Sequence, residues 1–169
     1  MGRIIAVANQ KGGVGKTTTA VNTAAAMSAM KRRVLLIDLD PQGNATMGSG
    51  IDKHELERST LDALMGEIAV ADCVQRAPEA GYDILPSNSD LTAAEVRLLD
   101  APLREKRLEL ALTPVRESYE YILIDCPPSL NMLTLNALVA ADSVLVPLQT
   151  EYYALEGLSA LLSTVQQIK

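Results

Sequence analysis

Four short apolar runs constrain the fold of this chain more than any other feature of its sequence. They cover residues 3–8, 34–37, 121–124 and 143–146. Within each run the apolar residues follow one another and do not alternate with polar ones, which is typical of strands buried on both faces of a parallel sheet. A weaker run over residues 82–85 predicts one more strand.

Helical patterns separate these runs. The expected helices cover residues 17–30, 60–66, 91–99, 103–118, 130–141 and 155–168, with Asp90 as the N-cap of the third and a loop over 48–58. Strands that alternate with helices predict right-handed βαβ units, and hence a mostly parallel central sheet covered by helices on both faces. The length of the chain, 169 residues, fits a single α/β domain over residues 1–169.

The composition excludes several classes of protein. With 48% hydrophobic residues the chain can bury a core, and its net charge of -6 argues against a general polyanion-binding surface. Cys73 and Cys126 are far apart and have no neighbouring histidine, so they fit neither a disulfide framework nor a zinc site. No apolar stretch approaches the ~18 residues of a membrane span. We therefore expect a cytoplasmic protein that does not bind membranes.

A glycine-rich segment between the first strand and the first helix predicts a phosphate-binding loop. The residues expected to contact a nucleotide are Gln10, Lys11, Gly12, Gly13, Val14, Gly15, Lys16, Thr17 and Thr18. Glycines let successive backbone N–H groups point at phosphate oxygens, and the Lys16 ammonium suits the β and γ phosphates. The Thr17 hydroxyl is a natural ligand for Mg²⁺, and the Thr18 hydroxyl can donate a hydrogen bond to an α-phosphate oxygen. The strict P-loop pattern has glycine where this chain has Gln10.

Two other interpretations of this segment are weaker. One is a glycine-rich turn that binds no ligand, which the combination of strand, Gly-Lys-Thr and helix disfavours. The other is a dinucleotide site of the Rossmann type, but the chain lacks G-x-G-x-x-G, and a lysine inside the turn suits a triphosphate better. A nucleoside triphosphate with Mg²⁺ is therefore the expected ligand.

Three aspartates stand at the ends of predicted strands. Asp38 and Asp40 follow the second run and Asp125 follows the third. Ligands of open α/β sheets bind beyond the carboxyl ends of the strands, and carboxylates there can hold Mg²⁺ through its water shell or orient an attacking water. The alternative is that Asp38 and Asp125 only cap turns or begin helices.

Four ordered motifs resemble those of the ParA/Soj chromosome and plasmid partition ATPases. Residues 11–18, KGGVGKTT, are similar to the deviant Walker A motif, whose hallmark is the additional lysine at Lys11. Residues 36–44, LIDLDPQGN, resemble the second motif of that family, residues 122–129 resemble its Walker B strand, and residues 147–157 resemble a later segment. The resemblance implies a P-loop NTPase-like fold.

The resemblance also implies roles for single residues. Lys16 would contact the β and γ phosphates, Asp40 would position the water for hydrolysis, and Lys11 would reach the phosphates held by the partner subunit of a nucleotide-sandwich dimer. Gly12 would lie at the seam of that dimer.

For the metal, the resemblance implies that Thr17 binds Mg²⁺ while Asp38 and Asp125 lie in its outer shell.

The function implied is an ATP-dependent molecular switch for chromosome or plasmid partition. Such a protein hydrolyses ATP slowly, dimerises with ATP, binds nucleoid DNA without sequence preference, acts with a ParB-like partner, and is nucleoid-associated in the cytoplasm. Two alternatives stay open: a truncated nucleotide-binding module without productive dimerisation, and a MinD-like positioning ATPase. The latter would need a basic amphipathic C-terminal helix, which the apolar face over 155–168 does not supply.

The chain looks C-terminally incomplete relative to this family. It ends at Lys169, whereas family members continue with elements that complete the adenine pocket and carry basic DNA-binding residues. After Arg116 the only basic residue is Lys169. We therefore expect weak ATPase activity and weak DNA binding from these 169 residues.

Overall fold

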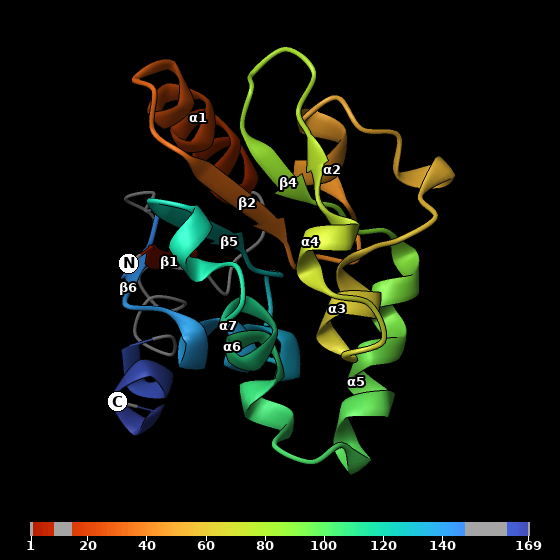
Figure 1. Ribbon diagram of the computed structural model, residues 1–169. Helices are drawn as coiled ribbons and strands as arrows, with labels where there is room; N and C mark the ends of the chain where they lie inside the picture. The colour runs from red at the N-terminus through yellow and green to blue at the C-terminus, as the bar shows by residue number, and fades with distance from the viewer. Residues whose placement is uncertain (1, 9–14, 148–161, 169) are drawn as a thin grey trace.

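The computed structural model describes residues 2–8, 15–147 and 162–168, and within them it contains a six-stranded sheet (Figure 1). The strands are β1 Arg3–Val7, β2 Val34–Asp38, β3 Gln75–Arg76, β4 Asp83–Leu85, β5 Tyr121–Asp125 and β6 Ser143–Leu145. Their order is β3-β4-β2-β5-β1-β6, and only the β3–β4 pair is antiparallel. The mostly parallel sheet and its five expected strands are confirmed.

Short helices connect the strands. The α-helices are α1 Lys16–Ala29, α2 Asn44–Gly48, α3 Thr60–Leu64, α4 Val70–Cys73, α5 Ala94–Arg97, α6 Arg107–Leu112 and α7 Met132–Ala140. Single 3₁₀ turns lie at Lys53–Glu55, Ser89–Ala93, Leu98–Asp100, Arg104–Lys106 and Arg116–Ser118. Residues 162–168 are also helical. None of the helices in the described ranges is long and apolar enough to cross a membrane.

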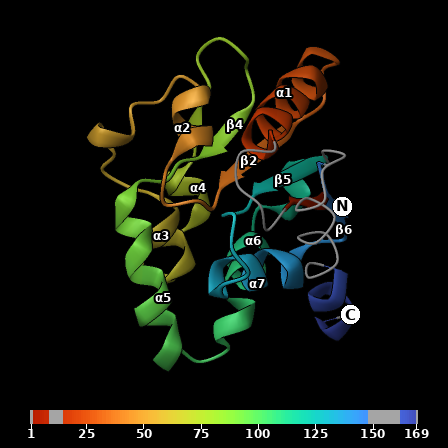
Figure 2. The ribbon, with the colours of Figure 1, turned by 180° about the vertical axis from the view of Figure 1, so that it is seen from behind.

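Helices cover both faces of the sheet, as expected (Figures 1 and 2). On one face, α1 and α2 pack through Ala20, Ala24 and Ala45 against Leu36 and Leu123 of the central strands. These small side chains let α1 approach the sheet closely. On the other face, residues of α3, α5, α6 and α7 pack against the alternate side chains of the same strands. The central strands are therefore buried on both faces, which explains their uninterrupted apolar sequences.

Several expected elements differ in the structure. The helix expected over 103–118 is interrupted at both ends: Leu103 has a left-handed backbone (φ 52°), and α6 ends at Leu112 because Pro114 has no N–H to donate. Asp90 is not the N-cap of the next helix, because the Asn88 side chain accepts the Asp90 N–H. Of the helix expected over 155–168, only residues 162–168 lie within the described part of the chain.

The sheet brings the acidic strand ends together. β2 and β5 are neighbours, and Asp38 and Asp125 are directly opposite each other in their register. The Leu39 N–H donates to the Asp125 carbonyl at 2.9 Å, which fixes the chain just beyond both strands. The N-terminus of α1 reaches the same edge of the sheet, as the contacts of Lys16 and Thr17 with Asp125 show.

Candidate nucleotide-binding site

Helix α1 begins at this edge of the sheet with a glycine. Gly15, the N-cap, has a left-handed backbone (φ 77°), and a Cβ built on it would meet nothing within 4 Å. The first turn of α1 contains no acidic side chain. The N-terminus of a helix has unpaired N–H groups and a partial positive charge, so this end is suited to an anion.

Lys16, Thr17 and Asp125 form a bonded group at the start of α1. The Lys16 ammonium lies 2.6 Å from Asp125 Oδ1, and the Thr17 hydroxyl donates to Asp125 Oδ2 at 3.0 Å. Asp125 is fully buried and Lys16 is 7% exposed. Burial raises the pKa of Asp125, and the neighbouring Lys16 charge opposes that rise. Three of the residues expected to bind ATP and Mg²⁺ are thus in direct contact.

Asp38 is turned towards α2. Its Oδ2 accepts the N–H (2.8 Å) and the hydroxyl (2.7 Å) of Thr46, and its Oδ1 accepts the Asp40 N–H at 3.1 Å. Burial, reinforced by the charge of Asp125, raises the pKa of Asp38 to about 6, although the bonds from Thr46 oppose the rise. The structure therefore places Asp38 next to Asp125 but bonds it to α2, so it ties that short helix to the strand.

Asp40 lines a cavity of about 490 Å³ at this edge. The other residues around it are Gly15, Lys16, Thr17, Thr18, Gln42, Asn44 and Pro128. Asp40 Oδ1 accepts the Gln42 N–H at 3.0 Å. Gln10, Lys11, Gly12, Gly13 and Val14 lie outside the described residues. The cavity thus brings an ammonium, two hydroxyls and a carboxylate together in front of a helix N-terminus.

Three polar side chains behind the site were not expected from the sequence. The Thr46 hydroxyl also accepts the Ser87 N–H (2.9 Å), the Ser87 hydroxyl donates to the Asp40 carbonyl (2.6 Å), and the Thr60 hydroxyl donates to the Asp38 carbonyl (2.9 Å). All three are fully buried. Ser87 could have been found, because it follows an expected strand at the same edge. For Thr46 and Thr60 no motif gave a signal.

Comparison with known proteins places this chain in a family. A family model described as an AAA domain matches residues 2–169. The sporulation initiation inhibitor protein Soj of Bacillus subtilis is 52% identical over 169 residues, which are all of this chain and 67% of Soj. The chain belongs to the ParA/Soj family of partition ATPases. The chromosome partitioning protein ParA of Myxococcus xanthus is another family relative, 52% identical over 100% of this chain and 60% of its own length. The chain thus spans 67% and 60% of the lengths of these two curated relatives.

A solved structure shares the fold of this ParA/Soj chain closely. It is that of cobyrinic acid a,c-diamide synthase from Mycobacterium smegmatis with bound ADP and magnesium, with a TM-score of 0.95 and 45% identity over 99% of this chain and 68% of that one. The P-loop NTPase-like fold is thereby confirmed.

The donors of the site fit Mg²⁺. The Thr17 hydroxyl is an oxygen donor of the kind that Mg²⁺ prefers, and the Asp125 carboxylate, to which that hydroxyl donates, could hold a water of the metal's outer shell. Within the described ranges no three His, Cys, Asp or Glu residues gather as metal ligands do. Mg²⁺ usually keeps several waters and binds through one or two protein oxygens plus phosphates, so this sparse set is sufficient.

Proposed function

We propose that this chain is the nucleotide-binding part of an ATP-dependent switch for chromosome or plasmid partition. The observation that carries the proposal is the contact of Lys16 and Thr17 with the buried Asp125, beside the cavity that Asp40 lines. Membership of a family of partition ATPases supports the same conclusion.

The residues of the site divide the work of binding and hydrolysing ATP. The α1 N-terminus and Lys16 hold the phosphates, and Thr17, backed by Asp125, holds Mg²⁺. When bound, Mg²⁺ offsets the charge that develops on the phosphate oxygens. Asp40 orients the attacking water, and the Ser87 hydroxyl on its carbonyl fixes the backbone from which that carboxylate extends. Asp38 keeps α2 in place through Thr46.

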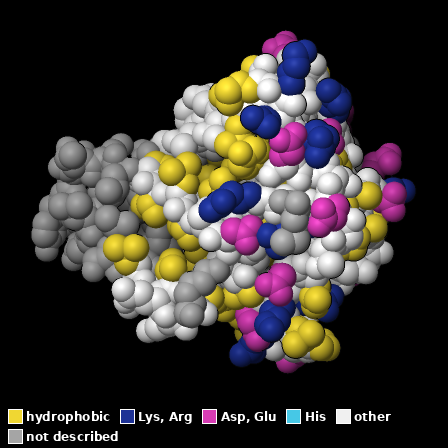
Figure 3. All heavy atoms as spheres, turned by 60° about the vertical axis from the view of Figure 1, so that its left-hand side comes forward, with side chains coloured by type: hydrophobic (Ala, Val, Ile, Leu, Met, Phe, Trp, Pro, Cys, Tyr) yellow, Lys and Arg dark blue, Asp and Glu magenta, His cyan; other side chains and the backbone are white. Residues whose placement is uncertain are grey.

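The switch requires two copies of the chain. Lys11 supplies a positive charge to the phosphates of the partner subunit, as an arginine finger does elsewhere, so hydrolysis is slow and depends on dimerisation. A ParB-like protein and nucleoid DNA are the proposed partners of the whole protein. On the face that Figure 3 shows, Lys and Arg side chains lie among Asp and Glu. Such interleaved charges favour weak, salt-sensitive DNA binding by residues 1–169 alone.

Measuring the mass of the full-length protein in solution tests the proposal. We expect monomers with ADP and Mg²⁺, and dimers with ATP and Mg²⁺ that Asp40→Ala makes long-lived. Lys11→Ala and Gly12→Val should abolish the dimer, whereas Lys106→Gln, which removes one exposed charge from a distant 3₁₀ turn, should not. Release of phosphate from ATP, measured in parallel, should fall with the loss of the dimer.

Other results would favour other functions. Monomers under every condition, with nucleotide still bound, would leave only a nucleotide-binding module. ATP-dependent retention on anionic vesicles would indicate a MinD-like positioning ATPase. ATP turnover that depends on an amide donor and not on dimerisation would indicate a synthase, the activity named for the Mycobacterium smegmatis protein.

A further inference from the structure

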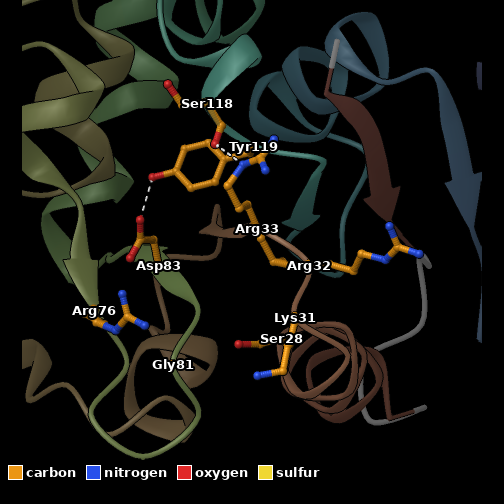
Figure 4. A pocket seen from close by; sticks show the side chains of 10 residues that line it. Ser28, Lys31, Arg32, Arg33, Arg76, Gly81, Asp83, Ser118 and Tyr119 are labelled. Carbon is orange, nitrogen blue, oxygen red and sulfur yellow. Dashed lines mark hydrogen bonds between the residues drawn. The ribbon is translucent and has the colours of Figure 1, made fainter.

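A second polar pocket lies at the opposite end of α1 from the nucleotide site. It has a volume of about 400 Å³ and is bordered by the last turn of α1, the turn that follows it, and the amino-terminal ends of β2 and β4 (Figure 4). Helix α1 has 14 residues and therefore separates the two sites by about 20 Å. Neither the family motifs nor the proposed ATPase function uses this pocket.

Two hydrogen-bond donors converge beside Gly81. A Cβ built on Gly81 would lie 3.4 Å from the Ser28 hydroxyl and 3.7 Å from Arg76 Nη2, so both groups approach one point in space. Gly81 has a left-handed backbone (φ 82°), which glycine adopts without strain. In Figure 4, Arg76 lies on one side of this point and Ser28 with Lys31 on the other. The absence of a side chain at Gly81 keeps the space between them open.

The charges of this pocket are not balanced. Arg32 and Arg33 both pair with Glu120, whose pKa they lower, and Figure 4 shows Arg32 pointing away from the other side chains. Asp83 accepts the Tyr119 hydroxyl at 2.7 Å. Within the described ranges, neither Lys31 nor Arg76 has an ion pair. A protein with a net charge of -6 thus has two cations without an ion pair, Lys31 and Arg76, facing one hollow that also holds the single carboxylate of Asp83.

Stabilisation of α1 does not explain this arrangement. A cation after the last turn of a helix interacts favourably with the helix dipole, which accounts for Lys31. Arg76 comes from β3, at the edge of the sheet, and has no such role. Its guanidinium offers a planar set of donors that matches phosphate oxygens, and the Ser28 hydroxyl adds a further donor.

We propose that Arg76, Lys31 and Ser28 form a second anion site, which binds a phosphate group above Gly81. The group belongs either to a free phosphorylated molecule or to the backbone of a nucleic acid, since both present the same tetrahedral anion. Asp83 faces the same hollow with its carboxylate bonded to the Tyr119 hydroxyl, and its remaining negative charge would oppose the binding of a second phosphate.

The test measures binding at Gly81 directly while the nucleotide site is filled. The full-length protein is saturated with ADP and Mg²⁺, and inorganic phosphate is titrated at constant ionic strength while the Gly81 N–H and Arg76 Nε–H signals are followed by NMR. We expect both signals to shift and saturate together. Arg76→Gln should weaken this binding by about tenfold, because a charged hydrogen bond is lost. Lys106→Gln, the matched loss of a distant exposed charge, should leave it unchanged.

A short DNA duplex in place of phosphate distinguishes the two sources. Saturable shifts of the same signals with phosphate identify a site for free phosphorylated molecules, and shifts with the duplex alone identify a nucleic-acid backbone site. Shifts that chloride reproduces, or that Arg76→Gln does not weaken, would overturn the proposal. Gly81→Ala, which fills the space, should reduce phosphate binding in the same way. The phosphate titration does not depend on dimerisation, so failure of the protein to form the ATP-dependent dimer would not contradict this proposal.

Discussion

At the scale of single residues, Asp38 makes the stability of the protein depend on pH. Its pKa is raised from 3.8 to about 6 in the folded state. The folded protein therefore binds this proton more tightly than the unfolded chain does. Asp38 therefore stabilises the folded protein most below pH 4, where it is protonated. This stabilisation, roughly 3 kcal/mol, is lost as the pH rises through 6.

Asp38→Asn isolates this contribution. The variant has no proton to lose, so its free energy of unfolding, relative to that of the native sequence, should increase between pH 4 and pH 7. Urea unfolding at several pH values, with Mg²⁺ chelated, measures the difference. Asp100→Asn, in an exposed 3₁₀ turn, controls for net charge. A constant difference between the Asp38→Asn variant and the native protein would contradict the assignment.

Thr46 is the residue on which the polar network behind the site depends. Its hydroxyl donates to Asp38 and accepts the Ser87 N–H, and all these groups are buried. Thr46→Val keeps the shape but leaves a carboxylate oxygen and an N–H with fewer partners. We expect the free energy of unfolding to fall by about 2–4 kcal/mol, and ATP hydrolysis to fall because Asp38 and Asp40 lose a common support.

A matched threonine provides the control for that experiment. Thr113 is exposed and its hydroxyl donates only to the Glu109 carbonyl one turn earlier. Thr113→Val should change the free energy of unfolding by less than about 0.5 kcal/mol. If urea unfolding gave the two substitutions equal effects, the hydrogen bonds around Thr46 would not contribute more to stability than those of an exposed threonine.

At the scale of secondary-structure elements, the buried strands could be predicted and the short connecting elements could not. An uninterrupted apolar sequence results directly from burial on both faces, so β1, β2 and β5 could be predicted from the order of their residues alone. Helix α2 has only five residues, and it depends on the left-handed backbone of Gly43 and on a hydrogen bond to the Asp38 carboxylate. Neither the backbone angle nor this tertiary contact can be read from the local sequence pattern. The edge strand β3 has two exposed residues and hence no apolar pattern. The apolar periodicity of residues 103–118 predicted one continuous helix, although Pro114 indicates that the helix ends before it.

Gly43 should control the position of α2. It has a φ of 69°, and a Cβ there would approach the Lys53 side chain at 2.8 Å and the Ser87 carbonyl at 3.0 Å. Gly43→Ala combines backbone strain with a clash, so we expect a loss of about 2–3 kcal/mol. Gly48→Ala, at the other end of α2, meets only Val21 at 3.5 Å and should be neutral or stabilising. Urea unfolding ranks the two variants, and the reverse order would exclude this account of α2.

At the scale of the whole molecule, α1 connects its two most polar regions. Its first turn contacts Asp125 at the carboxyl edge of the sheet, and its last turn borders the basic pocket at the amino edge. Between them, Ala20 and Ala24 fix the helix against the sheet. A ligand at the first turn therefore stabilises an element that packs across β2 and β5, and its effect should extend to global unfolding.

Thermal unfolding with ADP and Mg²⁺ should detect this stabilisation. A ligand present at a hundred times its Kd adds about 2.7 kcal/mol, which raises the Tm of a domain of this size by roughly 5–10 °C. Thr17→Val removes the hydroxyl that bonds Asp125, so the part of the rise that depends on Mg²⁺ should disappear, while the part seen with ADP and a chelator persists. Thr113→Val should retain both parts. If Thr17→Val kept the full Mg²⁺-dependent rise, the Thr17 hydroxyl could not be the oxygen donor that holds the metal.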